Sequence, residues 1–220
     1  SVDGVEMADR QVERAFRLID AEPETIDDAD YGGLLELHCR ALDIFGNFRR
    51  LNEIVQARLP RLVAIGPSPE LVICLTLQAL SRCHGAQYSR ALELIEEAAT
   101  ISDRIADETS ATWVKVAKMR IYSDTETATN AEIEDIYADA RPVAARLDNR
   151  HLIQASIYNL PASYRGIGKR KKAEALVDEL EAFRREKNDT SAIADGHWAQ
   201  ATHFSPTGEA TPATDSSTAT

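Results

Sequence analysis

The stretch that decides the fold runs from Tyr88 to Glu93 and reads YSRALE. It places a small residue, Ala91, three positions after an aromatic one, where two helices of a hairpin would cross closely. Small or compact residues recur at matching points of the chain, at Leu51, Ala91, Ala131 and Ala173. A period of about 40 residues with two helical segments per period is typical of a helical solenoid.

Apolar residues recur at helical spacing through most of the chain, whereas the alternating β-branched runs typical of strands are nearly absent. Residues 5–19 fit one helix, an acidic loop follows at 21–30, and four helix pairs come next. The expected pairs are 31–45 with 48–63, 69–83 with 87–104, 108–122 with 130–147, and 150–166 with 169–187. This pattern predicts an all-α fold.

The chain divides into three expected parts. Residues 1–30 form a partial N-terminal repeat helix with its acidic loop, and residues 31–187 form the helical repeat domain. Residues 188–220 form a C-terminal segment that ends in a disordered tail, because the low-complexity stretch after Ser205 offers too little apolar surface to order itself.

Prolines mark expected helix ends. Ser68 before Pro69 predicts a helix start with proline in the first turn. Pro60, Pro142 and Pro161 fall inside expected helices. Because proline lacks an N–H and its ring clashes with the preceding turn, each of them predicts a kink or a boundary.

The turns between paired helices share a motif. Residues 46–51 read GNFRRL, residues 88–93 read YSRALE, and residues 168–173 read GKRKKA. These stretches resemble the Gly-x-Tyr/Phe-x-x-Ala turn of the tetratricopeptide (TPR) repeats. Leu51 stands in the alanine position of the first turn, and Gly85 lies one residue early in the second. The third pair carries only its alanine.

This resemblance implies a right-handed α-solenoid of antiparallel helix pairs, about four pairs plus a partial N-terminal one. The period of about 40 residues, rather than the roughly 34 of standard TPR repeats, is similar to that of long-helix arms at the C-terminal side of large bacterial regulators. In such regulators an NTPase or nucleotide-cyclase unit often precedes the arm. The abrupt start within a helical pattern likewise predicts that the chain is part of a longer protein.

Composition limits the classes of partner. The chain has 220 residues, 25 Lys and Arg against 36 Asp and Glu, and a net charge of −11. Phosphate contacts need a cationic surface, so a chain this acidic is a poor general nucleic-acid binder, and we expect no nucleic-acid partner. No apolar run approaches the roughly 20 residues of a membrane-spanning helix. Three cysteines do not make a disulfide framework, and we expect a reduced, cytoplasmic setting.

Potential metal ligands and acidic clusters have simpler interpretations. The pairs His38-Cys39 and Cys83-His84 lie about one repeat apart and could suggest zinc, but adjacent helical residues point in different directions, so buried core thiols are favoured. The acidic run from Asp27 to Asp30 has no phosphate-binding loop beside it and fits a capped, solvated link. We expect no metal, cofactor or catalytic constellation, and hence no enzyme.

In the TPR resemblance, the first helix of each pair lines a concave groove. Under the expected register, the residues that face this groove are Glu36, Arg40, Asp43, Thr76, His84, Arg120, Asn159 and Arg165. A polar groove with several positive points suits a peptide that carries acidic or carboxylate groups. The basic cluster from Arg165 to Lys172 is open to three interpretations: a solvated helix start, a docking face for an acidic protein segment, or a nucleic-acid contact.

Two functional hypotheses follow. The first is a non-catalytic protein- or peptide-interaction module, the helical-repeat arm of a larger cytoplasmic regulatory protein. The second is a regulatory arm of a transcription regulator or nucleotide cyclase that senses a small ligand or signalling peptide. An open polar groove favours the first, and a closed apolar pocket favours the second.

Overall fold

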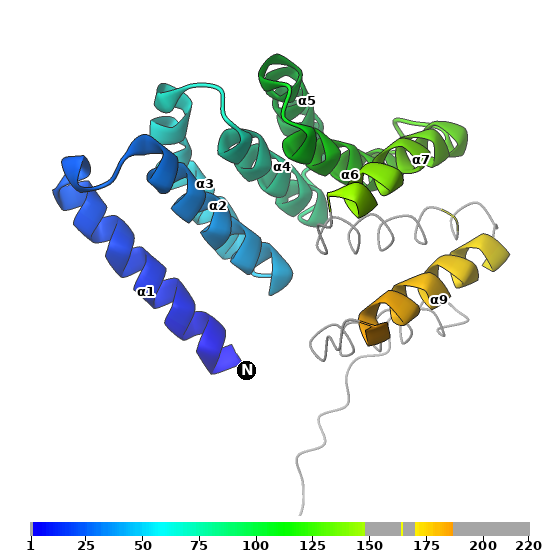
Figure 1. Cartoon of the computed structure of the whole chain (residues 1–220), viewed down its shortest axis with the longest axis horizontal. Coiled ribbons are helices and arrows are strands. Elements are labelled where there is room, and N and C mark those ends of the chain that lie inside the picture. Colours follow the sequence, from blue (N-terminus) through cyan, green and yellow to red (C-terminus); the bar gives the residue numbers. More distant parts are fainter. Residues whose placement is uncertain (1, 148–163, 165–169, 187–220) are drawn as a thin grey trace, which may run out of the picture.

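The structure is a computed structural model, which describes residues 2–147, 164 and 170–186. The helices of these ranges are α1 (Val2–Ala21), the 3-10 turn η1 (Pro23–Thr25), α2 (Asp28–Ile44), α3 (Phe48–Ile65), α4 (Pro69–His84), α5 (Tyr88–Ile105), α6 (Glu108–Thr125), α7 (Asn130–Arg146) and α9 (Arg170–Glu186) (Figure 1). No strand occurs within these ranges, which confirms the all-α prediction. The first helix of the fourth expected pair and the segment 188–220 lie outside the described residues.

Side chains just before the helices explain where several of them begin. The carboxylates of Asp27 and Asp107 accept hydrogen bonds from the third residue of α2 and α6, at 2.8 and 2.7 Å. Ser68 does the same for Leu71 at the start of α4, as its position before Pro69 predicts. Thr129 forms a reciprocal capping box with Glu132 at the start of α7. Such caps satisfy amide groups that have no partner within the helix.

The two described interior prolines do not end their helices. Pro60 lies inside α3 and Pro142 inside α7, so of the two predicted outcomes, a kink or a boundary, the boundary is wrong and the kink stays a prediction. Both prolines are exposed. The carbonyl that each leaves without an amide partner can therefore bind water instead, which lowers the cost of the missing hydrogen bond. Pro161 lies outside the described residues.

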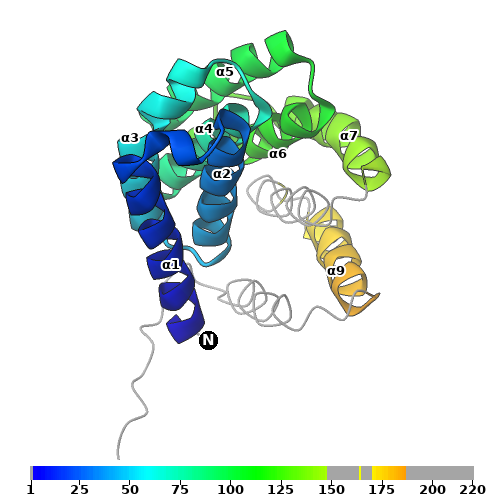
Figure 2. The same cartoon turned by 60° about the vertical axis from the view of Figure 1, so that its left-hand side comes forward.

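The helices stack as a row of hairpins. Helices α2, α4 and α6 contact one another in sequence, and α3, α5 and α7 each pack against the first helix of their own pair. In Figure 2 the row curves, with α2 and α6 on its inner side and α3 and α5 on its outer side. This nearest-neighbour packing is the arrangement expected of a solenoid.

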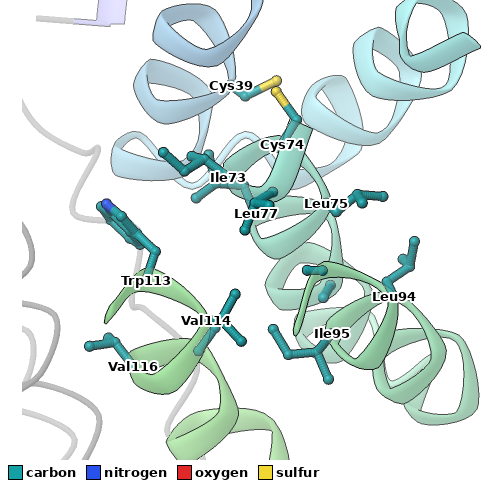
Figure 3. Close-up of a cluster of buried hydrophobic side chains, with 14 of the residues drawn as sticks. Cys39, Ile73, Cys74, Leu75, Leu77, Leu94, Ile95, Trp113, Val114 and Val116 are labelled. Carbon is teal, nitrogen blue, oxygen red and sulfur yellow. The ribbon is translucent and has the colours of Figure 1, made fainter. Parts of the chain in front are cut away.

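Helix α4 forms the centre of the core. Every residue from Leu71 to Ala79 is buried, because α4 touches α2, α3, α5 and α6. Figure 3 shows its apolar side chains between Cys39 of α2 and Trp113 of α6. Seven of these nine residues are apolar, as burial on all sides of a helix requires, and the other two are Thr76 and Gln78.

The three described hairpins repeat with a strict period. Gly46, Ala86 and Glu126 stand at equal intervals along the chain and adopt left-handed conformations with φ of 67°, 55° and 54°. The next amide in each turn donates to the carbonyl five residues back, which is the hydrogen bond of a Schellman motif. The left-handed residue of the second turn is therefore Ala86, and Gly85 has an ordinary φ of −83°. The left-handed position lacks a glycine in two of these turns although the turn geometry is the same.

The second helix of the third pair starts later than the sequence period predicts. Ala131 is exposed, whereas Ile133 is only 2% exposed and holds the position that Leu51 and Ala91 hold in α3 and α5. Each of these buried residues is the fourth of its helix. Helix α7 begins four positions after its left-handed residue, whereas α3 and α5 begin two positions after theirs. The assignment of Ala131 to the repeat position is therefore wrong.

Candidate functional site

Six of the eight residues that the sequence predicts to line a groove lie in the described helices. Glu36, Arg40 and Asp43 lie on α2, Thr76 and His84 on α4, and Arg120 on α6. These three helices contact one another in order, α2 with α4 and α4 with α6. Asn159 and Arg165 lie outside the described residues and stay predictions.

Glu36 and Arg40 form an ion pair one helical turn apart, with 2.6 Å between Arg40 Nη2 and Glu36 Oε1. The guanidinium of Arg40 also lies 4.8 Å from the centre of the Trp113 ring. This cation–π contact links α2 to α6, two first helices that are separated by α4. Arg40 is therefore held in place from two sides, and only a fifth of its side chain is exposed.

Asp43 is a half-buried carboxyl near the C-terminal end of α2. Burial raises its pKa from 3.8 to about 6, since removing water from a carboxylate disfavours its charged form. Near neutral pH, Asp43 is a poorly hydrated negative charge. A cation or a hydrogen-bond donor of a bound partner would compensate for that lost hydration.

Thr76 does not belong to the accessible surface. It is 0% exposed, and its hydroxyl donates to the Val72 carbonyl oxygen at 2.8 Å within α4. The prediction that Thr76 faces a groove is therefore wrong. Helix α4 is covered on both sides by α2 and α6, which removes from solvent a position that would be open on a less enclosed helix.

His84 and Arg120 lie in a mixed cluster at the ends of α4 and α6. The His84 ring stacks on Phe48 of α3, with 4.3 Å between ring centres. Arg120 Nε donates to Asp124 at 2.7 Å, and the Cys83 thiol donates to the same carboxylate at 3.5 Å. Each charge in this cluster has a neighbour of opposite sign or a polar partner.

The titration of this cluster follows from its packing. Partial burial, followed by the positive charge of Arg120, lowers the pKa of His84, so its ring is neutral near pH 7. Burial and then Asp124 raise the pKa of the Cys83 thiol to about 12. Cys83 is therefore a thiol rather than a reactive thiolate.

Sequence reasoning did not identify Trp113, Phe48 and Asp124, which contact Arg40, His84 and Arg120. Trp113 lies far along the chain from Arg40, and no local spacing connects the two. Asp124 could have been found, because Arg120 and Asp124 stand four residues apart, the spacing of ion pairs on a helix. The repeat period also places Asp124 at the position that His84 holds one repeat earlier.

The cysteine and histidine pairs lie in separate surroundings. The sulfur atoms of Cys39 and Cys74 face each other between α2 and α4 in Figure 3, and Cys83 bonds to Asp124. His38 Nε2 lies 2.7 Å from Asp9 Oδ1. All three cysteines are buried, as the core-thiol interpretation predicts. In the part of the chain that the structure describes, no group of three or more potential ligands is arranged to hold a metal ion.

Three residues of the basic cluster, Arg170, Lys171 and Lys172, lie in the described part of the chain, at the start of α9. Arg170 pairs with Glu174 at 2.8 Å, and Lys172 pairs with Glu134 of α7 at 3.1 Å. The ammonium of Lys172 also lies 5.2 Å from the centre of the Tyr164 ring. These contacts account for two charges of the cluster within the fold itself.

Comparisons with solved structures identify the fold. One similar structure is the crystal structure of a single-substitution variant of a Podosopora anserina putative kinesin light chain, which is described as having nearly identical TPR-like repeats. Its sequence is 17% identical to this chain, the TM-score is 0.52, and the match covers 84% of this chain and 89% of that one. Another is BtubC (BKLC) from P. vanneervenii, 20% identical, with a TM-score of 0.50, covering 84% of this chain and 91% of that one. No family model and no curated protein matches the chain. The chain thus has a TPR-like α-solenoid fold, as its turn motifs predict.

Among the helices that the structure describes, none combines the length and apolar character needed to cross a bilayer.

Proposed function

We propose that this chain is a non-catalytic interaction module that binds a peptide or a helix of a partner protein on the inner face of α2, α4 and α6. The observations that support this most are the Glu36, Arg40 and Asp43 set on α2 and the Arg120–Asp124 ion pair on α6. These are partly exposed charged groups on two first helices of one curved row, with α4 between them. A surface of this kind suits an extended protein ligand better than a small apolar molecule.

The charge balance of this face refines the expected partner. Arg40 and Arg120 already hold carboxylates of their own helices, whereas Asp43 is a third acid that burial has stripped of water. Three acids therefore stand against two bases. To the peptide with acidic or carboxylate groups that the sequence predicts, we add a positive charge: we propose a peptide of mixed charge with a Lys or Arg side chain for Asp43 and a carboxylate for Arg40 or Arg120.

The wider context is part of the same proposal. A module that binds proteins without catalysing a reaction serves as the helical-repeat arm of a larger cytoplasmic regulatory protein. This role rests on the TPR-like fold and on the long repeat, both typical of such arms. The alternative, a ligand-sensing arm, would need an enclosed apolar pocket, and the charged inner face favours protein docking instead.

A displayed library of random 12-residue peptides tests the proposal. Peptides selected on the wild-type chain are measured by titration calorimetry against Arg40→Glu, Asp43→Lys and Arg120→Glu. We expect each variant to weaken binding by at least tenfold. Arg90→Glu is the matched control, because Arg90 lies on the outer helix α5 and is 54% exposed. The proposal is wrong if the selection yields no binder. It is also wrong if Arg90→Glu weakens binding as much as the three inner-face substitutions do.

A further inference from the structure

One face of α2 corresponds, one repeat period earlier, to the face of α4 that packs against the preceding hairpin. The left-handed residues Gly46 and Ala86 lie one period apart in identical turns, so each residue of α2 corresponds to the α4 residue one period later. The α2 end face is defined here as Leu34, Leu37, Ala41 and Ile44. The counterparts of its first three members are Cys74, Leu77 and Ser81.

On α4 these counterparts pack against the preceding hairpin. Cys74 and Leu77 are 0% exposed and Ser81 is 2% exposed. Cys74 meets Cys39 of α2 in Figure 3. The Ser81 hydroxyl donates to the Phe48 carbonyl oxygen of α3 at 3.0 Å and accepts from Asn52 Nδ2 at 2.7 Å. This face of a first helix is therefore the one that holds the hairpin before it.

On α2 the same face is more open: Leu34 and Ala41 are partly buried, and Leu37 and Ile44 are exposed. Leu37 is 65% exposed and Ile44 is 54% exposed, and Phe45 beside them is 60% exposed. Helix α1 covers an adjoining face, where Phe16 makes ring contacts with Tyr31 and His38. Large apolar side chains at i and i+7 of one helix face, here Leu37 and Ile44, are the pattern of a helix–helix contact. The α4 counterpart of Leu37 is the fully buried Leu77, whereas that of Ile44 is the exposed His84.

We propose that the α2 end face binds one amphipathic helix of a partner protein, which lies along α2 as α2 lies along α4. The contact would continue the established row of first helices, α2 to α4 to α6. The partner helix carries apolar side chains at i, i+3, i+4 and i+7, which would pack against Leu37 and Ile44. Lys and Arg flank that stripe, because residues 1–30 hold ten acids against three bases.

The probe is a fluorescein-labelled 18-residue helical peptide with Leu and Ala at these spacings and Lys elsewhere, and its binding is followed by fluorescence anisotropy. We expect saturable binding that falls at least tenfold in Leu37→Gln and in Ile44→Gln. Val63→Gln is the matched control, because Val63 is a 52% exposed apolar residue on α3. It should change the affinity by less than twofold, and a peptide with Glu in place of Lys should bind at least tenfold more weakly.

The proposal is wrong if the peptide shows no saturable binding, or if Val63→Gln lowers its affinity as much as Leu37→Gln does. It is also wrong if light scattering shows a dimer that Leu37→Gln converts to a monomer, because a second copy of the chain would then occupy the face. The longest natural form of the polypeptide is tested in parallel. If it fails to bind a probe that the 220-residue chain binds, a segment of the same polypeptide fills the site and the partner assignment is wrong. Arg120→Glu should leave this binding unchanged, which separates it from the inner face.

Discussion

Gly46 and Ala86 occupy the same left-handed position in two successive hairpins, and only the first of them is a glycine. An L-residue in this conformation brings its Cβ too close to the backbone carbonyl, at a cost of about 1 kcal/mol. Ala86 and Glu126 are held there by the turn hydrogen bonds and by the packing of the helices on either side. The hairpin geometry is thus determined by tertiary packing as well as by residue type.

Ala86→Gly should stabilise the protein by about 0.5–1 kcal/mol, because relief of the left-handed strain outweighs the added flexibility of the unfolded chain. Glu126→Gly should act in the same direction, and Gly46→Ala should destabilise by about 1 kcal/mol. Urea unfolding followed by circular dichroism measures all three. Gly85→Ala is the control, since Gly85 has a φ of −83° and a Cβ there meets nothing closer than 3.5 Å. A larger loss from Gly85→Ala than from Gly46→Ala would contradict the turn assignment.

The sequence was sufficient for the helices and the hairpin order because these depend on local signals. Ser68 before Pro69 predicts a helix start, and the structure has a helix cap there. The 40-residue spacing of Leu51 and Ala91 can be read along the chain without knowledge of tertiary contacts, and both residues are buried. It was not sufficient for Ala131, because two extra residues in a polar link change the register without changing the apolar pattern of the helix.

The inner face was predictable only in part. Glu36 and Arg40 lie on the first helix of their pair, as the sequence predicts, and their position on the inner face stays a prediction. Thr76 was misplaced because its burial depends on how closely α2 and α6 approach α4, which no single helix encodes. Trp113 was missed because its contact with Arg40 joins residues two hairpins apart.

The corrected register of α7 predicts that tryptophan at Ala91 strongly destabilises the protein, whereas tryptophan at Ala131 has little effect on stability. Ala91→Trp should destabilise the protein by roughly 2–4 kcal/mol or prevent folding, because Ala91 is 0% exposed and a well-packed site cannot hold an indole. Ala131→Trp should change stability by less than about 0.5 kcal/mol, because Ala131 is exposed. Thermal unfolding by circular dichroism compares them, and similar melting shifts would show that the register is still misassigned.

Ile133→Ala tests the same register from the other side. Ile133 is 2% exposed at the position of Leu51 and Ala91 in their helices, so truncation leaves a cavity and should cost about 2–4 kcal/mol. Ile136→Ala, at a half-buried position of the same helix, is expected to cost clearly less. The reverse order in urea unfolding would place a different face of α7 toward α6.

Asp43→Asn should stabilise the protein near neutral pH. Burial raises the folded-state pKa of Asp43 to about 6 from 3.8, so the folded state holds its proton more tightly than the unfolded state does. The unfavourable contribution is absent below about pH 4, grows as the pH rises towards 6, and is complete above that, at roughly 1–3 kcal/mol. Urea unfolding at about pH 4.5 and pH 7.5 should show the larger gain at the higher pH. An equal gain at both values would mean that Asp43 titrates normally.

The attachment of α1 should depend on ionic contacts. Arg58 of α3 reaches Asp20 at 3.1 Å and Glu13 at 3.8 Å, and its guanidinium lies 4.0 Å from the centre of the Phe16 ring. Arg58→Met keeps the apolar stem over the ring and removes the charge, and we expect the α1 amides to exchange with solvent about fivefold faster, which corresponds to about 1 kcal/mol. Adding 0.5 M NaCl should produce most of the same change in the wild type and little in the variant. Arg49→Met is the control, because that side chain is 91% exposed and pairs with Glu53 of its own helix. If Arg49→Met accelerates exchange in α1 as much as Arg58→Met does, the effect comes from net charge and not from this contact.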